Sequence, residues 1–575
     1  MNIIQGHASR WIVPQSSSRI AEIAAQHTIS YPIAQVLLSR GYSESPEIEK
    51  FLFTDSSSLA PITELKHAER AVERILSAIN TGEKVLISGD YDVDGITASS
   101  LMMLCLRPLS QAINFFLPHR TRDGYGLSIT TVERAAHNGY SLLITVDNGI
   151  TAHEPVRRAR ELNLDVIITD HHTPLGGVPD AYAVVNPHQE GCAYPFKYFA
   201  GVGVVFKLMS LLYERLNKPL PEKAYELLLL GTVADVVPLK GENRYWVRYG
   251  LARVNKNRSY ALNKLCTQAK ITKDSLTSLD IGFGVAPQIN ALGRLDDPRD
   301  GVQFLIGTDT TIIDTVGEHL LRCNIARKDI ERTVLQDIIA QINSGVLDIT
   351  QRRVIVAAGS HWPPGVIGLV ASRLVGIYNR PVIIMHVGSD GIAKGSGRSL
   401  GKFNLFQALS HCATLLEKFG GHAHAAGLSI ESAKIPKFIE MIDAYAHTIL
   451  TTDDLISTLT LDAQLSLPEI TAHFMRDMRH LEPFGAENKQ PVFYISNGTI
   501  IKTPQLLKEQ HVKAALFDQG VIKPILFFNK PELYPILCDL VSSQQNISVA
   551  AHVVENHWNG SVSTELQGLD ICVAQ

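Results

Sequence analysis

This 575-residue sequence has few cysteines and no long apolar stretch. Its seven cysteines include no CxxC pair, which excludes a zinc ribbon and suggests no disulfide framework. No apolar run approaches the roughly 20 residues that span a bilayer, and the N-terminus, MNIIQGHASRWIVP, has no apolar signal-peptide core. We therefore expect a protein of the reducing cytoplasm that does not enter a membrane.

An excess of basic residues is also missing. The chain has 53 lysines and arginines against 57 acidic residues, a net charge of −4. This balance excludes a generally basic coat for nucleic acid, but it leaves room for a local basic groove. The length and the hydrophobic content of 45% are those of a globular protein with roughly three or four domains.

Acidic residues are concentrated in one short stretch, GDYDVDG, at residues 89–95. Asp90, Asp92 and Asp94 alternate, so their carboxylates would crowd one side of an extended segment and repel one another unless a cation lay among them. An EF-hand calcium loop begins in the same way, but it needs a glutamate at its twelfth position and an entering helix. This chain has Leu101 and the strand-like KVLIS there, so the stretch predicts a different metal site.

Further polar residues follow strand-like apolar runs. LLITV (142–146) leads to Asp147, and VIIT (166–169) leads to the triplet DHH at 170–172, just as VLIS (85–88) leads to the acidic stretch. Helix-like segments separate these runs, a pattern that predicts a parallel sheet with crossover helices. Ligands collect beyond the carboxyl ends of such strands, so we expect these polar groups to converge. Asp235, at the expected end of a buried helix in ELLLLGTVADVVPL, is the fourth member of the set.

The set carries more information than its members do. A lone Asp147 would suit a turn after a strand. Several carboxylates beside two adjacent histidines are instead the mixture of oxygen and imidazole ligands that suits paired Mn²⁺ or Mg²⁺ ions. With no thiolate among these residues, the chemistry we favour is a two-metal hydrolase.

These stretches also carry a family resemblance. GDYDVDG, TVDNGI, TDHH and GTVADVVPL resemble, in order and spacing, the four motifs of the DHH phosphoesterases. Further stretches are similar to those of the family members that degrade single-stranded DNA from its 5′ end, among them PHRTRDGYGL, INALGRLDD, GSGRS, FGGHAHAAG and LEPFGAEN. Two positions depart from the family: Gln288, where an arginine is usual, puts a phosphate contact in doubt, and Glu487, where a glycine is usual, puts a turn in doubt.

The resemblance implies a ligand set for two Mn²⁺ or Mg²⁺ ions. Asp92 and Asp94 would favour different ions, and Asp147 would bridge both. Ser88 stands where related pyrophosphatases have a histidine, so Asp90 or water would complete the first ion's ligands. The six implied metal ligands are Asp90, Asp92, Asp94, Asp147, His171 and Asp235.

The resemblance also implies residues that act on the substrate. His172, with Asp147 the second implied catalytic residue, would lie near the scissile phosphate and donate to its oxygens. A pocket for the terminal 5′-phosphate would give the enzyme its direction. The implied substrate-binding residues are Arg120, Arg294, Arg373, Ser396, Arg398 and His422.

By resemblance the fold is α/β: a parallel-sheet DHH domain is joined by a long helix to a smaller α/β DHH-associated domain, and a C-terminal OB-fold β-barrel follows. The expected ranges are an N-terminal extension at 1–50, the catalytic domain at 51–311, a helical connector at 312–345, the substrate-gripping domain at 346–454 and the barrel at 455–575. Arg322, Arg327 and Lys328 of the connector would line a passage for the strand, or would only solvate a helix face. Most aromatics near the barrel strands are expected in its core: Phe493, Tyr494, Phe527, Phe528 and Trp558.

The function implied is a 5′→3′ exonuclease that degrades single-stranded DNA to mononucleotides in recombination and repair. Single-strand-binding protein and a DNA helicase are the implied partners, and the enzyme is expected to be a monomer. Two alternatives remain: a phosphodiesterase of the same superfamily that acts on short oligonucleotides or nucleotide phosphates, and a non-catalytic single-strand binder. The extra barrel counts against the first, and the complete set of carboxylates and histidines against the second.

Overall fold

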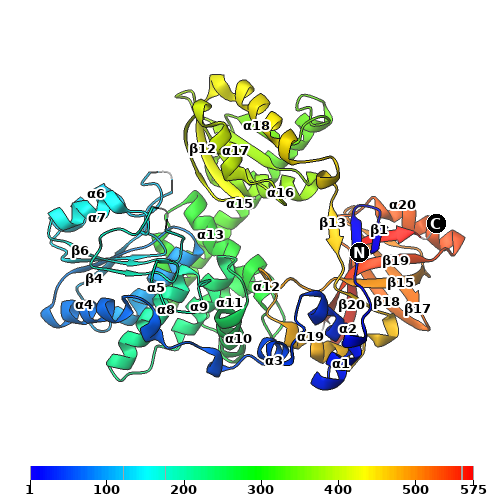
Figure 1. Cartoon of the computed structure of the whole chain (residues 1–575), viewed down its shortest axis with the longest axis horizontal. Helices are drawn as coiled ribbons and strands as arrows, with labels where there is room; N and C mark the ends of the chain where they lie inside the picture. Colours follow the sequence, from blue (N-terminus) through cyan, green and yellow to red (C-terminus); the bar gives the residue numbers. More distant parts are fainter. Residues whose placement is uncertain (1, 121, 175, 559–560, 574–575) are drawn as a thin grey trace.

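The computed structural model describes residues 2–120, 122–174, 176–558 and 561–573 (Figure 1). Its first unit is built on a five-stranded sheet in which every neighbouring pair is parallel, as the sequence predicts. The strands that contain VLIS, LLITV and VIIT lie next to one another. Their continuous apolar runs are typical of a parallel sheet that is covered on both faces. In spatial order the strands are β4 (Ile113–Phe116), β3 (Val85–Ser88), β5 (Leu142–Val146), β6 (Asp165–Thr169) and β7 (Ala183–Val185).

Helices supply that cover on both sides of the sheet. One face carries α4 (Ala68–Thr81), α5 (Val93–Leu106) and α8 (Gly201–Arg215), and the other carries α6 (Ile129–His137) and α7 (His153–Glu161). Further helices pack behind α5 and α8: α9 (Lys223–Ala234), α10 (Gly241–Lys256), α11 (Tyr260–Gln268), α12 (Ser278–Asp280), α13 (Ala286–Leu295) and α14 (Arg299–Ile306). α5 is buried on nearly all sides, because it lies between the sheet and α9. Its sequence is accordingly made of apolar and small residues, with Asp94 as the one charged side chain.

A single long helix, α15 (Thr310–Asn343), leads out of this unit, which confirms the helix predicted for the connector. The helix runs through Gly317 without interruption. A side chain at this position would meet Lys264 and Phe304, so the glycine allows α15 to pack closely against the first unit.

The second unit is a mixed five-stranded sheet with helices on both faces. Its strands are β11 (Leu416–Gly421), β12 (Ala425–Glu431), β10 (Ile392–Arg398), β9 (Val382–Val387) and β8 (Ile355–Gly359), in that order. α16 (Pro364–Tyr378) covers one face together with the end of α15, and α17 (Leu405–His411) and α18 (Ile435–Ile449) cover the other. The two glycines of GSGRS lie within strand β10.

The C-terminal unit is the closed five-stranded barrel that was predicted as an OB-fold. Its strands are β15 (Phe493–Ile500), β19 (Ile547–Trp558), β20 (Ser561–Val573), β18 (Val521–Phe527) and β17 (His511–Asp518), and β17 pairs with β15 to close the ring. Phe493 and Phe527 are fully buried in its core, Phe528 is exposed, and the side chain of Trp558 lies outside the described residues.

The N-terminal segment is part of this C-terminal unit. Strands β1 (Asn2–Gln5) and β2 (Arg10–Val13) form a sheet with β13 (Thr458–Thr460). Helices α1 (Ser18–His27), α2 (Tyr31–Ser39) and α3 (Ser45–Leu52) share the barrel's core with α19 (Ala472–Leu481) and α20 (Leu533–Ser543). Figure 1 shows the two chain ends together on the side opposite the parallel sheet.

Arg244 joins the first unit to the barrel and its N-terminal helices. Its buried guanidinium, on α10, donates to the carbonyl oxygens of Phe51, Leu481 and His480 at 2.8, 3.1 and 2.7 Å. Burial lowers its pKa to about 9. One side chain thus binds the ends of two helices, α3 and α19, and helps to position the barrel relative to the catalytic unit. Within the described residues, no helix has both the length and the apolar character needed to cross a membrane.

Candidate active site

The predicted metal ligands do converge at the carboxyl edge of the parallel sheet. Asp90 and Asp92 follow β3, Asp147 follows β5, and His171 follows β6. Asp94 lies in the first turn of α5, and Asp235 caps the C-terminus of α9, which packs along α5. All six side chains therefore come from the ends of elements whose packing is set by the apolar core.

His171 lies at the centre of this cluster. Its Nε2 atom is 3.1 Å from a carboxylate oxygen of Asp147, 3.6 Å from Asp235 and 3.9 Å from Asp94. Three overlapping groups each bring their ligand atoms within 4.8 Å of one another: Asp94, His171 and Asp235; Asp147, His171 and His172; and Asp90, Asp92 and Asp147. Asp147 and His171 each belong to two groups, an arrangement suited to two neighbouring cations.

The backbone is shaped to bring Asp147 into this position. Its φ of +62° is left-handed, a conformation that asparagine and aspartate adopt more readily than most residues. Gly201, at the start of α8, lies so close that a Cβ atom there would stand 2.5 Å from the Cβ of Asp147. The amides of Gly201 and Val202 in turn donate to the Asp94 carboxylate at 2.6 and 2.8 Å, which fixes that side chain at the N-terminus of α8.

The cluster concentrates negative charge in a buried place. Burial, and then neighbouring carboxylates, raise the pKa values of Asp90, Asp147 and Asp235 well above the ordinary range and that of Asp94 to about 7. Burial and the neighbouring His172 lower the pKa of His171 to about 3, so its ring is neutral.

These residues fit a pair of divalent cations. Buried oxygens of Asp90 and Asp147 and the Nε2 atom of His171 have no hydrogen-bond partner among the described residues. Buried polar atoms are normally paired, and oxygens with one neutral imidazole are the donors that Mn²⁺ and Mg²⁺ accept.

Asp170 has a role that the sequence did not reveal. One of its oxygens accepts from Nδ1 of His172 at 2.7 Å, and the other accepts from the amide of Ile150 at 2.9 Å. Burial acts to lower the pKa of His172, but the hydrogen bond and the charge of Asp170 outweigh it and raise that pKa. Because Nδ1 of His172 faces Asp170, its other ring nitrogen, Nε2, points away from Asp170. The available signal was its position, directly after a buried strand and before two histidines.

Three of the predicted phosphate-binding arginines gather beside the carboxylates. Arg120 lies 4.0 Å above the ring of Tyr91, a contact that sequence reasoning missed, and donates to the carbonyl of Gly293. Arg294 donates to the carbonyl of Gly365 at 2.9 Å. Arg398 donates to the Ser396 hydroxyl at 3.2 Å.

No carboxylate neutralises these three side chains within the described residues. Burial, then the charges of Arg120 and Arg327, lower the pKa of Arg294 to about 10, and burial lowers that of Arg398. Asp296, two residues after Arg294, does not neutralise it; the Asp296 carboxylate contacts His319 at 2.9 Å instead. Half-buried arginines with no acidic partner are suited to bind a phosphate.

The other predicted substrate residues are placed differently. Arg373 forms an ion pair with Glu331 of α15, and Arg327 pairs with the same carboxylate at 2.8 Å. Arg327 is buried, so it neither solvates a helix face nor stands free along a passage. His422 is exposed in the turn between β11 and β12, beside the end of β10 that carries Arg398.

Both departures from the family pattern have a structural explanation. Gln288 is buried and donates to the carbonyls of Leu265 and Gly284, so it lies in the core rather than at a phosphate contact. Glu487 has a φ of +54°, the region in which glycine is least strained, and it forms an ion pair with Lys240 at 2.7 Å.

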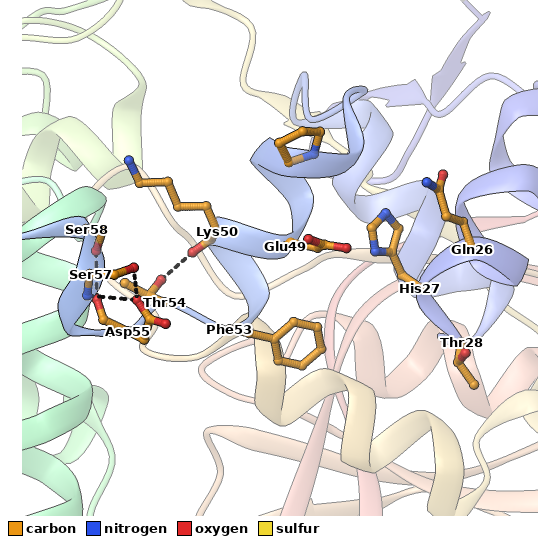
Figure 2. Close-up of a pocket in the computed structure, with 11 residues that line it drawn as sticks. Gln26, His27, Thr28, Glu49, Lys50, Phe53, Thr54, Asp55, Ser57 and Ser58 are labelled. Atoms are coloured by element: carbon orange, nitrogen blue, oxygen red, sulfur yellow. Dashed lines mark hydrogen bonds between the residues drawn. The ribbon is translucent and has the colours of Figure 1, made fainter.

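A hollow of about 650 Å³ lies elsewhere, between α1, α3 and the segment that follows α3 (Figure 2). His27, Glu49, Lys50 and Phe53 are among its lining residues, and none of the predicted site residues lines it. The hollow is therefore separate from the predicted metal ligands, which lie at the edge of the parallel sheet.

Known proteins share this arrangement. The models of the DHH family N-terminal domain, the DHHA1 domain and the RecJ OB domain match residues 84–232, 351–448 and 461–570. The single-stranded-DNA-specific exonuclease RecJ of Bacillus subtilis is 33% identical over 98% of this chain and 71% of its own length, and that of Escherichia coli is 33% identical over 85% and 87%. The chain belongs to the RecJ family. RecJ from Thermus thermophilus in complex with Mn²⁺ superposes with a TM-score of 0.82 at 28% identity, covering 98% of this chain and 80% of that one.

A RecJ structure from the same organism in complex with Mg²⁺ has a TM-score of 0.75 at 27% identity, covering 98% of this chain and 78% of that one. These matches confirm the predicted RecJ-type architecture of DHH, DHH-associated and OB-fold units. They also fit the Mn²⁺ or Mg²⁺ that the carboxylate cluster predicts.

Proposed function

We propose that this protein is a single-stranded-DNA-specific exonuclease that uses two Mn²⁺ or Mg²⁺ ions to release mononucleotides from 5′ ends during recombination and repair. One observation carries the proposal: in a chain of the RecJ family, the carboxylate and histidine cluster lies next to three half-buried arginines that lack acidic partners among the described residues. Hydrolysis and phosphate recognition thus meet at one place.

Each residue of the cluster has a defined task in this proposal. Asp92, Asp94, Asp147, His171 and Asp235 would hold the two ions, and Asp90 would lie at the first ion's edge. When bound, two such ions activate water and neutralise charge on the phosphate. His172, whose pKa the Asp170 carboxylate raises and whose ring it orients, would donate to a phosphate oxygen.

Polarity requires a second feature, since metal ions cut a phosphodiester without regard to which end is near. We propose that Arg294, Ser396 and Arg398 bind the terminal 5′-phosphate and that Arg120 contacts a neighbouring one. Their donors surround the first turn of α16, whose own amides add to the positive field. Arg373 and His422, on the edge of this group, would contact the strand further along.

The remaining parts of the proposal rest on the family. Residues 51–311 would carry the chemistry, 312–345 would hold the units apart so that a strand threads between them, 346–454 would grip the end, and 455–575 would bind the incoming strand. A monomer acting with single-strand-binding protein and a helicase would suit this role. All seven cysteines are free thiols, in keeping with a reducing cytoplasm.

Replacement of Asp147 by alanine tests the chemistry. The variant should lose hydrolysis of a 5′-labelled single strand, with affinity for the strand largely intact because phosphate contacts elsewhere dominate binding. Asp90→Ala should lose less, since water can replace a peripheral ligand. Near-normal turnover in Asp147→Ala would show that the two-metal assignment is wrong.

A further inference from the structure

A second group of metal-binding side chains lies where α13 ends and the connector α15 passes it. Asp296 caps the C-terminus of α13, and His319 and Cys323 project from α15 one turn apart. The ligand atoms of these three residues lie within 4.8 Å of one another. None of them belongs to the catalytic cluster or to the phosphate-binding group.

The two nitrogens of the His319 ring face different carboxylates. Nε2 is 2.9 Å from Asp296, and Nδ1 is 3.6 Å from Asp300. Histidines that bind metals commonly direct the second ring nitrogen to a carboxylate, which fixes the tautomer and the ring orientation. Asp300 lies on that side of the ring, just beyond hydrogen-bond distance, and would orient His319 once Nε2 and Asp296 held a cation.

Cys323 supplies the independent observation. Cys323 is only 8% exposed, it forms no disulfide bond, and its sulfur lies within 4.8 Å of the ligand atoms of Asp296 and His319. A buried thiol facing a histidine and a carboxylate is an unused ligand. By contrast, none of the metal-binding groups at the sheet edge contains a cysteine among the described residues.

We propose that Asp296, His319 and Cys323 bind a thiophilic divalent cation such as Zn²⁺, with water completing a four-coordinate site and Asp300 orienting His319. One oxygen, one nitrogen and one sulfur donor suit Zn²⁺, whereas Mn²⁺ and Mg²⁺ favour the carboxylate cluster. The bound cation would tie the end of α13, two residues beyond Arg294, to the connector helix. This proposal does not depend on the exonuclease activity.

Cobalt substitution tests the site directly, because a Co²⁺ ion bound to a thiolate has a near-ultraviolet charge-transfer band that oxygen and nitrogen ligands do not produce. Titration of the full chain with Co²⁺ alone should yield this band with a stoichiometry of one, and Zn²⁺ should abolish it. Cys323→Ser and His319→Ala should remove the band. Asp300→Asn should weaken Co²⁺ binding about 10- to 100-fold, the usual effect of losing such a carboxylate.

Cys538→Ser is the matched control, since Cys538 belongs to no metal-binding group among the described residues. Its band should equal that of the unmodified protein. The proposal is wrong if saturating Co²⁺ gives no charge-transfer band, because the cluster is then only a hydrogen-bonded pair of His319 and Asp296. It is equally wrong if the band survives in Cys323→Ser.

Discussion

At the scale of single residues, Asp147 shows the conflict between stability and function. Its carboxylate is buried among four others, so its pKa is raised, first by burial and then by Asp94, Asp92, Asp235 and Asp90. A carboxyl whose folded pKa lies above its unfolded value destabilises the metal-free fold as pH rises above about 4. The cost is about 1.4 kcal/mol for each pH unit until the folded group ionises.

Asp147→Asn should therefore stabilise the metal-free protein while it abolishes hydrolysis. Asparagine adopts the left-handed conformation of this position as readily as aspartate does, so the backbone is not strained. In chelator at pH 7, the variant should unfold at a higher temperature than the original chain, and the difference should shrink toward pH 4. Asp539→Asn, an exposed substitution, is the control. An equal or lower melting temperature for Asp147→Asn at pH 7 would contradict the electrostatic account.

Asp170 offers a second test at this scale. Asp170→Asn keeps the shape of the side chain but removes the charge that raises the pKa of His172 and orients its ring. Turnover should fall about 10²-fold or more with little change in KM, since the loss affects the reacting complex rather than strand binding. Steady-state kinetics on a short single strand give kcat and KM separately and so measure both effects. Asp165→Asn, at the other end of the same strand, should leave both constants close to normal; a change in KM alone for Asp170→Asn would assign Asp170 to binding.

The convergence of the proposed metal ligands could be predicted from the sequence, because they lie at the ends of apolar runs whose strands and helices were themselves predictable. Asp170 was not assigned a role, since its task depends on the direction of the neighbouring His172 ring, which spacing does not encode. The burial of Gln288 was not predictable for a similar reason. Its side chain turns into the core toward Leu265, a residue 23 positions away in the chain.

At the scale of elements, the first turn of α16 lies between Arg294 and Arg398, two of the arginines proposed to bind phosphate. The carbonyl of Gly365 accepts from Arg294, and a Cβ atom on Gly368 would stand 2.9 Å from the Ser396 hydroxyl and 3.1 Å from Arg398. This contact between a helix end and strand β10 was not predictable, because it joins parts of the chain that share no local pattern.

Arg398→Ala tests whether this element recognises the 5′ end. Loss of a charge-assisted hydrogen bond costs about 1.5–3 kcal/mol, so cleavage of 5′-phosphorylated strands should fall about 10- to 100-fold. Cleavage of strands with a 5′-hydroxyl should fall less, and the difference between the two substrates should narrow. Lys394→Ala, an exposed change on the same strand, is the control. An unchanged preference for the 5′-phosphate in both Arg294→Ala and Arg398→Ala would place end recognition elsewhere.

At the scale of the whole molecule, the barrel is joined to the catalytic unit through Arg244 and through the N-terminal segment. The order of the domains was predictable from motifs along the chain. The packing of residues 2–52 against the barrel was not, because it pairs segments more than 400 residues apart, such as the amide of Ala8 and the Asp570 carboxylate. The amphipathic helices of the segment only indicate that some apolar partner covers them.

Arg244→Met should loosen this junction. Three carbonyl oxygens would lose their donor, so the melting temperature should fall, and long strands should be released before they are fully degraded. Very short oligonucleotides, which do not reach the barrel, should still be cut at close to the normal rate. Early release is measured as the length of the partly degraded fragments that a long labelled strand leaves when excess trap DNA prevents rebinding. Arg253→Met, on the same helix but paired with Glu222, should remain processive; equal processivity in Arg244→Met would mean that the barrel's position does not matter.

Digestion of end-labelled DNA is the most direct test of the central claim that this cluster hydrolyses single strands from the 5′ end with divalent metal ions. The same sequence is offered as a 5′-labelled strand, a 3′-labelled strand and a blunt duplex, with Mn²⁺, Mg²⁺ or chelator. The structure predicts labelled mononucleotides at once from the 5′-labelled strand, progressively shorter fragments from the 3′-labelled strand, slow attack on the duplex, and no product in chelator. Equal attack on the blunt duplex, or mononucleotides released first from the 3′ end, would contradict the account.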